Sequence, residues 1–194
     1  MNETIKNLAL AFVGESQARN RYSIYAEIAK EGGHTTVAEV FLLTADNERE
    51  HAKWNYRMLS ALVKKSGGDV SEINIPISVP LILGDTKENL RGAIAGEHHE
   101  TATMYPDFAR AAEKEGFNDV AARIRAIGMA EEHHRKRYKR LLDELEGRAE
   151  DVKADGASWV CSVCGYVHKG NAAPSRCPSC DSPREKFRRE SAND

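Results

Sequence analysis

Two short motifs of the sequence combine a carboxylate and an imidazole at the same spacing. The segments EREH and EEHH contain Glu48 with His51 and Glu131 with His134, three positions apart in each pair. Because positions i and i+3 of an α-helix lie on one face, both side chains of each pair can reach the same point. Carboxylates with imidazole suit iron or manganese, and zinc also remains possible. The two motifs therefore predict metal ligands on two helices.

Three further carboxylates, Glu15, Glu97 and Glu100, interrupt apolar helical faces such as the one that begins with Leu8 and Phe12. Burying an unpaired carboxylate costs on the order of several kcal/mol, so each interruption needs either a misread face or a compensating partner. All the interruptions fall near mid-helix, and mid-helix positions of an antiparallel bundle meet at one level. Five carboxylates at that level would repel one another and protonate unless cations were present.

These residues match the ligand pattern of dinuclear carboxylate proteins, in which two helices each give a Glu and two others each give Glu-x-x-His. The predicted ligands are Glu15, Glu48, His51, Glu97, Glu100, Glu131 and His134. A single Glu or His on a helix is usually a solvated group, but four coincident interruptions favour a dinuclear site. The remaining histidines and one acid fall off these faces and are predicted to be solvated: His34, His98, His99, Glu132, His133 and His168.

The cysteines form a second predicted metal site. Cys161-x-x-Cys164 is followed, after 12 residues, by Cys177-x-x-Cys180, and the chain has no other cysteine. Paired Cys-x-x-Cys turns place four thiolates around one ion, and such a cluster indicates metal rather than disulfides. A tetrahedral sulfur site holds zinc as well as iron. One redox-active iron beside a dinuclear redox site favours iron here.

Four long helical patterns must position the carboxylates. They cover about 2–31, 35–65, 85–116 and 118–147. Short glycine-containing turns make the first and last pairs antiparallel, whereas residues 66–85 are long enough, at about 3.3 Å per residue, to run the length of the bundle. The predicted fold is an all-α, ferritin-like four-helix bundle with one long crossover. Its predicted divisions are a bundle over 1–146, a linker over 147–157 and a cysteine domain over 158–194.

The two halves of the bundle repeat. The alignment pairs Glu15 with Glu97, Tyr22 with Tyr105, Glu48 with Glu131, and His51 with His134. The second half has one extra residue just before Pro106, which predicts a π-bulge or a kink there. The two paired tyrosines lie one or two turns from the ligands, where a phenol can either pack or donate to a ligand carboxylate.

Composition limits the other classes of function. The 194 residues are 41% hydrophobic and 30% charged, with net charge −2, which suits a soluble globular protein and gives no reason to expect a nucleic-acid partner. The start of the chain does not resemble a signal peptide, and the longest uncharged run, 73–84, is too short to span a membrane. A cytoplasmic location is the resulting expectation.

With these motifs in order, the chain resembles the rubrerythrin family over nearly its full length. The resemblance lies in GESQARNRY, EREH, GEHHET, AEEHH and CGYVH…APSRCPSC. It implies a di-iron bundle fused to a rubredoxin-like Fe(Cys)4 domain. It also implies a peroxidase that reduces hydrogen peroxide to water in oxidative-stress defence, with electrons relayed through the cysteine site from a rubredoxin or an NAD(P)H-dependent reductase.

The resemblance also implies residue roles. Glu15, Glu48, Glu97, Glu131 and His134 would be core ligands, with Glu48 and Glu131 as bridges. Glu100 and His51 would exchange on one iron with redox state, which places them with Tyr22 and Tyr105 among the candidate catalytic residues. A homodimer is implied too, and electron transfer between its chains is a further prediction. The alternatives are a ferroxidase or iron-storage protein and a structural zinc protein.

Overall fold

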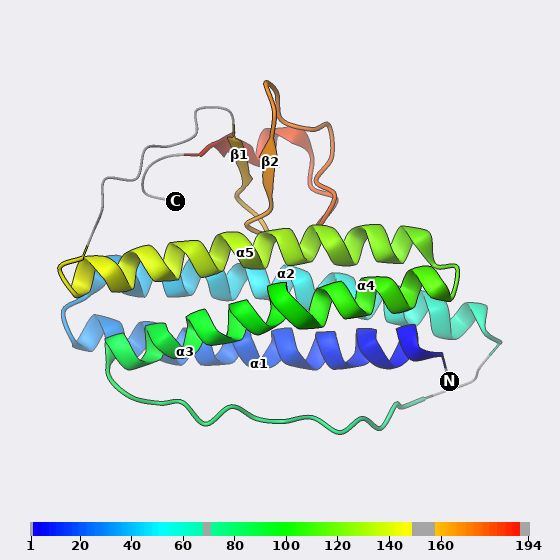
Figure 1. The fold of residues 1–194 in the computed structure, drawn as a ribbon, viewed down its shortest axis with the longest axis horizontal. Helices are drawn as coiled ribbons and strands as arrows, with labels where there is room; N and C mark the ends of the chain where they lie inside the picture. The colour runs from blue at the N-terminus through cyan, green and yellow to red at the C-terminus, as the bar shows by residue number, and fades with distance from the viewer. Residues whose placement is uncertain (1, 68–70, 149–157, 191–194) are drawn as a thin grey trace.

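The computed structural model describes residues 2–67, 71–148 and 158–190. Its larger part is a bundle of four helical rods, meaning four long stretches of helix. The third rod consists of three consecutive helices (Figure 1). The helices are α1 (Glu3–Glu31), α2 (Thr35–Lys65), α3 (Thr86–His99), the π-helix η1 (Glu100–Met104), α4 (Tyr105–Lys114) and α5 (Asn118–Leu145). The predicted all-α bundle is confirmed.

The connections give the predicted topology. Tight turns at Gly33 and Gly116, both with positive φ, return the chain so that α1 lies against α2, and α3 and α4 lie against α5. Residues 71–85 of the long connection between α2 and α3 run along the outside of the bundle (Figure 1). The connection ends in a capping box, in which Asp85 and Glu88 each bond to the other's backbone N–H at the start of α3. The single crossover is therefore confirmed.

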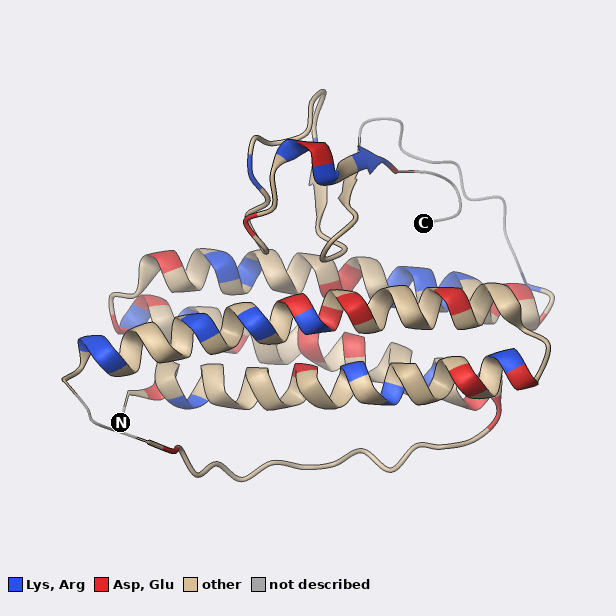
Figure 2. Ribbon diagram, turned by 180° about the vertical axis from the view of Figure 1, so that it is seen from behind, with Lys and Arg blue, Asp and Glu red and all other residues tan. Residues whose placement is uncertain are grey.

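The core of the bundle has two parts that lie on either side of the ligand level. One is rich in aromatic rings and contains Tyr22, Tyr25, Phe41 and Tyr138. The other is mainly aliphatic and draws on the opposite end of each helix, from Ile5 to Ala11 on α1 for example. Figure 2 shows acidic segments on neighbouring helices near mid-length, between these two parts. The ligands therefore sit in a layer enclosed by apolar packing.

The predicted irregularity in the third rod is present. Residues Glu100–Met104 form a π-helix that ends two residues before Pro106, in the segment where the second half of the repeat has its extra residue. A π-turn absorbs one inserted residue, so the residues before and after it keep their inward faces. Both Glu97 and Tyr105 are consequently buried.

The cysteine module is a small antiparallel sheet with strand order β2-β1-β3 and a 3-10 turn. Its elements are β1 (Ser158–Cys161), β2 (Val167–Lys169), η2 (Arg184–Lys186) and β3 (Phe187–Arg189). The module lies on the outer side of α5 near the middle of the bundle (Figure 1). Of the predicted linker, all but residues 147 and 148 lie outside the described residues. Within the described residues, no helix combines the length and hydropathy that crossing a membrane requires.

Candidate metal centres

Six of the seven predicted bundle ligands meet in two overlapping groups. One group is Glu15, Glu48, His51 and Glu131, and the other is Glu48, Glu97, Glu131 and His134. Within each group the ligand atoms lie within 4.8 Å of one another, and all six side chains are fully buried. Only Glu48 and Glu131 belong to both groups, so they stand between two adjacent positions for metal.

The two histidines face this shared pair of carboxylates. The Nδ1 atom of His51 lies 2.8 Å from Glu48 Oε2 and 2.7 Å from Glu131 Oε1. The Nδ1 atom of His134 lies 3.1 Å from Glu48 Oε1, 2.8 Å from Glu131 Oε2 and 3.7 Å from Glu97 Oε2. Each histidine therefore faces one of the two metal positions. The internal repeat, which pairs His51 with His134, is thus reproduced in the arrangement of these side chains.

Glu100 lies outside both groups. It is the first residue of η1 and is half-buried. Burial, followed by the carboxylates of Glu15, Glu97 and Glu131, raises the pKa of Glu100 well above its usual range. The carboxyl group is thus near the centre, although it is not one of the groups that converge there.

The protein atoms alone do not neutralise the charges of these buried acids and histidines. Burial and the neighbouring Glu48 raise the pKa of Glu15 to about 8. Burial also opposes ionisation of Glu48, but His134 and His51 outweigh it and lower the pKa of Glu48 to about 2. Burial lowers the pKa of His51, yet Glu48 and the other acids raise it overall to about 9. Cations between the acids would remove this conflict.

Many buried polar atoms of the same residues make no hydrogen bond of good geometry, although the histidine Nδ1 atoms lie close to the acids. These atoms are Oε2 of Glu15, Oε1 of Glu48, Oε2 of Glu97, both carboxylate oxygens of Glu131 and both ring nitrogens of His134. One unsatisfied buried group costs about 1–3 kcal/mol, so a converging set of them requires a partner. Five carboxylate oxygens and imidazole nitrogen around two points fit two metal ions.

Of the two possibilities left open for the paired tyrosines, packing or donation to a ligand carboxylate, the structure has the hydrogen bonds. The Tyr22 hydroxyl donates to Glu97 Oε1 at 2.6 Å, and the Tyr105 hydroxyl donates to Glu15. Asn55 in turn donates to the Tyr105 oxygen at 3.3 Å. Such partners fix the orientation of a ligand carboxylate before the metal binds.

The four cysteines surround a single point. Their Sγ atoms lie within 4.8 Å of one another, with 3.7 Å between Cys161 and Cys180 and 3.6 Å between Cys164 and Cys177. These separations are too long for disulfides, which need about 2.05 Å. Ligands about 2.3 Å from a tetrahedral ion are about 3.8 Å apart, so the thiols fit one bound ion.

The sequence matches the family model described as Rubrerythrin over residues 6–142, and the one described as Rubrerythrin, rubredoxin-like domain, over residues 159–188. The chain belongs to the rubrerythrin family. The bundle residues are accordingly the candidate ligands of a di-iron centre, and the four cysteines form a rubredoxin-like site.

Individual relatives agree along the full length of the chain. A provisionally named rubrerythrin of Methanocaldococcus jannaschii is 52% identical over 96% of this chain and 92% of its own. The rubrerythrin of Nitratidesulfovibrio vulgaris is 41% identical over 96% of this chain and 93% of its own. A structure of nigerythrin in its fully reduced, all-ferrous state has a TM-score of 0.68 and 29% identity, with 97% of this chain and 87% of that chain covered.

The rubredoxin-like module is docked on its own bundle beside the di-iron centre. Asn47 Nδ2 donates to the Val163 carbonyl at 3.0 Å, and His51 Nε2 lies 3.0 Å from the Cys164 carbonyl oxygen. Trp54 Nε1 donates to the Cys180 carbonyl at 3.0 Å, and Arg123 donates to the Ser179 carbonyl at 2.6 Å. All four side chains belong to the bundle, and all four acceptors lie in the two cysteine turns.

Gly165 allows an equally close contact beside the second histidine. A Cβ atom at position 165 would lie 2.3 Å from His134 Nε2, so a larger residue would not fit. The φ angle of Gly165, +74°, also favours glycine. Sequence reasoning missed the docking contacts of Asn47, Trp54 and Arg123, because isolated polar or aromatic residues on a helix carry no motif. A tryptophan on the outer side of α2 was the one available signal.

The prediction that His133 is solvated is wrong. The residue is only 6% exposed, and its Nδ1 lies 3.9 Å from Glu190 Oε1 of the rubredoxin-like module. Its position off the inward face of α5 indicates an outward side chain, and the docked module covers that outward face. His98 and His99 are exposed as predicted, while Glu132, His34 and His168 are half-buried.

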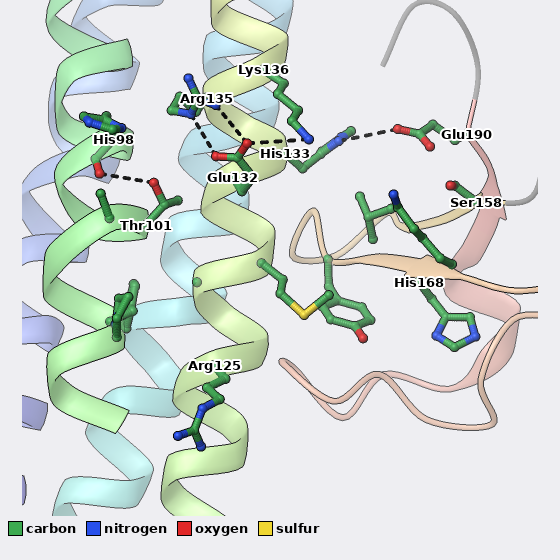
Figure 3. A pocket seen from close by; sticks show the side chains of 18 residues that line it. His98, Thr101, Arg125, Glu132, His133, Arg135, Lys136, Ser158, His168 and Glu190 are labelled. Atoms are coloured by element: carbon green, nitrogen blue, oxygen red, sulfur yellow. Dashed lines mark hydrogen bonds and ion pairs between the residues drawn. The ribbon is translucent and has the colours of Figure 1, made fainter. Parts of the chain in front are cut away.

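A cavity of about 940 Å³ opens at the seam between the bundle and the module (Figure 3). Its walls come from α3, η1, α4 and α5 of the bundle and from β1 and β2 of the module. Glu132 is held there by two 2.8 Å hydrogen bonds from Arg135. Tyr105, whose hydroxyl donates to Glu15, forms part of the wall, so the cavity ends one side chain away from the carboxylate cluster.

Proposed function

We propose that the protein is a peroxidase that reduces hydrogen peroxide to water, with electrons relayed from the rubredoxin-like site to the di-iron centre. One observation carries this proposal: His51 connects the two sites. Its Nδ1 faces Glu48 and Glu131, and its Nε2 lies 3.0 Å from the Cys164 carbonyl oxygen. When bound, two ferrous ions supply one electron each, which matches the two electrons needed to cleave one O–O bond to water.

The protein groups around the centre define its protonation and orientation. With Nδ1 of His51 directed at a metal, the ring proton resides on Nε2 and is donated to the Cys164 carbonyl. Tyr22 and Tyr105 hold Glu97 and Glu15 through their hydroxyl protons. The surrounding apolar packing limits water at the centre.

The exchange of Glu100 and His51 on one metal is part of the proposal. Glu100 begins the π-helix, an irregular segment in which a ligand can change position without unfolding a whole rod. His51 occupies the ligand group here and Glu100 does not. The arrangement supports a state in which His51 is the ligand and the nearby carboxylate of Glu100 is not bound.

The decisive experiment compares oxidants in a single turnover. The iron-loaded protein is reduced without oxygen and mixed with hydrogen peroxide or dioxygen, and the absorption of both sites is followed. Rapid oxidation by peroxide, faster than by dioxygen, is the expected result. Faster oxidation by dioxygen with accumulation of ferric mineral would favour iron storage, and zinc at both sites on metal analysis would contradict any redox function.

The proposed partners are hydrogen peroxide and a redox donor protein, either a rubredoxin or an NAD(P)H-dependent reductase. A homodimer and a cytoplasmic location also stay predictions. Reduction of the cysteine iron by each purified donor, followed at the thiolate absorption, would discriminate between the two donor classes.

A further inference from the structure

The two tyrosines that bond to ligand carboxylates have different surroundings. Both side chains are 1% exposed, and they are equivalent in the internal repeat. The Tyr22 ring packs against Tyr138, Phe41 and Tyr25, with centroids 5.4, 5.9 and 6.2 Å away. Within the described part of the chain, no aromatic ring packs in this way against Tyr105.

The rings around Tyr22 continue toward the outside of the bundle. Tyr25 packs against Phe41 with centroids 5.5 Å apart, and its hydroxyl donates to the Ile82 carbonyl of the crossover at 2.6 Å. Ile82 is 39% exposed. A continuous aromatic path therefore leads from Glu97 through Tyr22 to Tyr25, which is 2% exposed and is separated from solvent by the partly exposed Ile82 segment of the crossover.

Geometry at the inner end suits the oxidation of a phenol. A phenol that loses an electron becomes strongly acidic, so its proton must leave at the same time. The Tyr22 hydroxyl already points at Glu97 Oε1, 2.6 Å away, and this carboxylate accepts the proton over a very short distance. Electron tunnelling weakens steeply with distance, and rings with centroids about 6 Å apart are in or near contact.

We propose that Tyr22, supplied by Tyr25, is a one-electron donor to the di-iron centre when hydrogen peroxide meets a centre that holds one electron instead of two. The inference rests on the proposed function. A single electron would split peroxide into hydroxide and a hydroxyl radical. A second electron delivered at once from Tyr22 completes the reduction to water and prevents release of that radical.

The step balances. Hydrogen peroxide takes up two electrons and two protons to give two waters. The centre gives one electron, Tyr22 gives the other together with its phenolic proton through Glu97, and solvent gives the second proton. Tyr25 then donates an electron to the Tyr22 radical and releases its own proton at the crossover, while Tyr22 regains a proton from the Glu97 side. A small thiol or ascorbate, as external reductant, restores Tyr25 by electron transfer across the Ile82 segment of the crossover, to which the Tyr25 hydroxyl is bonded.

Tyr105 is the matched control because it is equally buried and also bonded to a ligand carboxylate, but lacks the ring path. The test uses the iron-loaded full-length chain, with one electron added per di-iron centre and the cysteine iron verified as ferric by its absorption. Hydrogen peroxide is added, and the sample is frozen for electron paramagnetic resonance. We expect a tyrosyl radical in the wild type and in Tyr105→Phe, and its loss in Tyr22→Phe. Ring-deuterated tyrosine should narrow the signal.

Tyr25→Phe provides a second measurement that leaves the bond to Glu97 intact. The radical should then form at Tyr22 and persist longer than in the wild type, because its supply from Tyr25 is cut. Absence of a radical in the wild type, an unchanged yield in Tyr22→Phe, equal loss in Tyr105→Phe, or an unchanged lifetime in Tyr25→Phe would each overturn the inference. The fully reduced protein would still be oxidised by peroxide in those cases, whereas failure of that oxidation would overturn the proposed function itself.

Discussion

The di-iron centre and the rubredoxin-like site are built on different principles. The first collects its six converging residues from α1, α2, α3 and α5, between positions 15 and 134 of the chain. The second takes all four ligands from residues 161–180. Geometry at the first therefore depends on the packing of the whole bundle, whereas geometry at the second depends on two tight turns of one short segment.

The difference extends to what each site does without metal. The carboxylates of the di-iron centre are fully buried, and several of their oxygens lack a hydrogen-bond partner. Among the four thiols, burial raises the pKa of Cys164 well above its usual range, whereas the neighbouring thiols lower the pKa of Cys161 and of Cys180. Burying acids from four helices around one centre thus links the fold of the whole bundle to its metal, whereas the thiol site involves only one short segment.

The largest expected effect is that of Cys161→Ala, which should remove the metal of one site and leave the other site occupied. Removing one of four local ligands should abolish metal binding at the rubredoxin-like site and eliminate its thiolate absorption, while the bundle keeps two metals. Metal analysis should fall from three ions per chain to two. Ser162→Ala, which alters the exposed neighbour, should retain three. One metal per chain in iron-loaded wild-type protein would contradict the dinuclear assignment.

The two histidines of the bundle should differ. His134→Ala should lose metal, because His134 meets Glu48, Glu97 and Glu131 with no reserve ligand beside it. His51→Ala should retain the oxidised metals, since Glu100 can replace the imidazole, but should slow peroxide oxidation by about tenfold or more, as disruption of metal-site partners does. Iron content and single-turnover rates measure both effects. Equal loss of metal in both variants would show that His51 is a permanent ligand.

The sequence predicts those parts of the fold and of the candidate site that depend on periodicity and local spacing. Acids on apolar faces located Glu15 and Glu97, and one extra residue before Pro106 located the π-helix. The sequence could not predict how the module docks on the bundle, because contacts such as that of Trp54 with Cys180 depend on how two separate units pack together. Which rings touch Tyr22 was equally hidden, since spacing assigns residues to the core without fixing their neighbours.

Trp54→Ala should weaken docking while leaving both metal sites occupied. Its ring lies under the Arg123 guanidinium, 3.9 Å from the ring centroid, and its Nε1 donates to the Cys180 carbonyl. Truncating such an anchor costs about 2 kcal/mol or more of interface energy. Oxidation of the cysteine iron after peroxide addition should slow in stopped-flow measurements. Trp159→Ala is the matched control, because that ring stacks with Arg189 inside the module.

The same comparison tests whether electrons pass within a chain or between chains. The docking contacts described here join the module to its own bundle, so electrons need not cross to a partner. The Cys161→Ala variant and the Glu131→Ala variant should each be inactive alone, and the intrachain route predicts that mixing the two variants restores nothing. Partial recovery of donor-driven activity in verified heterodimers would show that these surfaces meet across a dimer, as the cross-chain prediction requires.

The smallest expected effect is a pH dependence of the metal-free protein. Glu15 has a pKa of about 8 and His51 of about 9, both above their ordinary values, so the folded chain holds more protons than the unfolded one between the ordinary and raised values. Its free energy of unfolding should therefore fall as pH rises from about 6 to 9. The lowered pKa of Glu48, about 2, acts only in acid, where its contribution is lost as pH falls below its ordinary value.

Metal should reverse this trend, because binding requires deprotonated ligands and releases their protons, so that the stabilisation by metal grows with pH. Chelator-treated and iron-loaded chains would be unfolded in urea across the range. Glu15→Gln should flatten the decline below about pH 8, whereas Glu3→Gln, at an exposed position, should not. A metal-free chain that gains stability toward pH 9 would show that these acids and histidines do not share buried charge in solution.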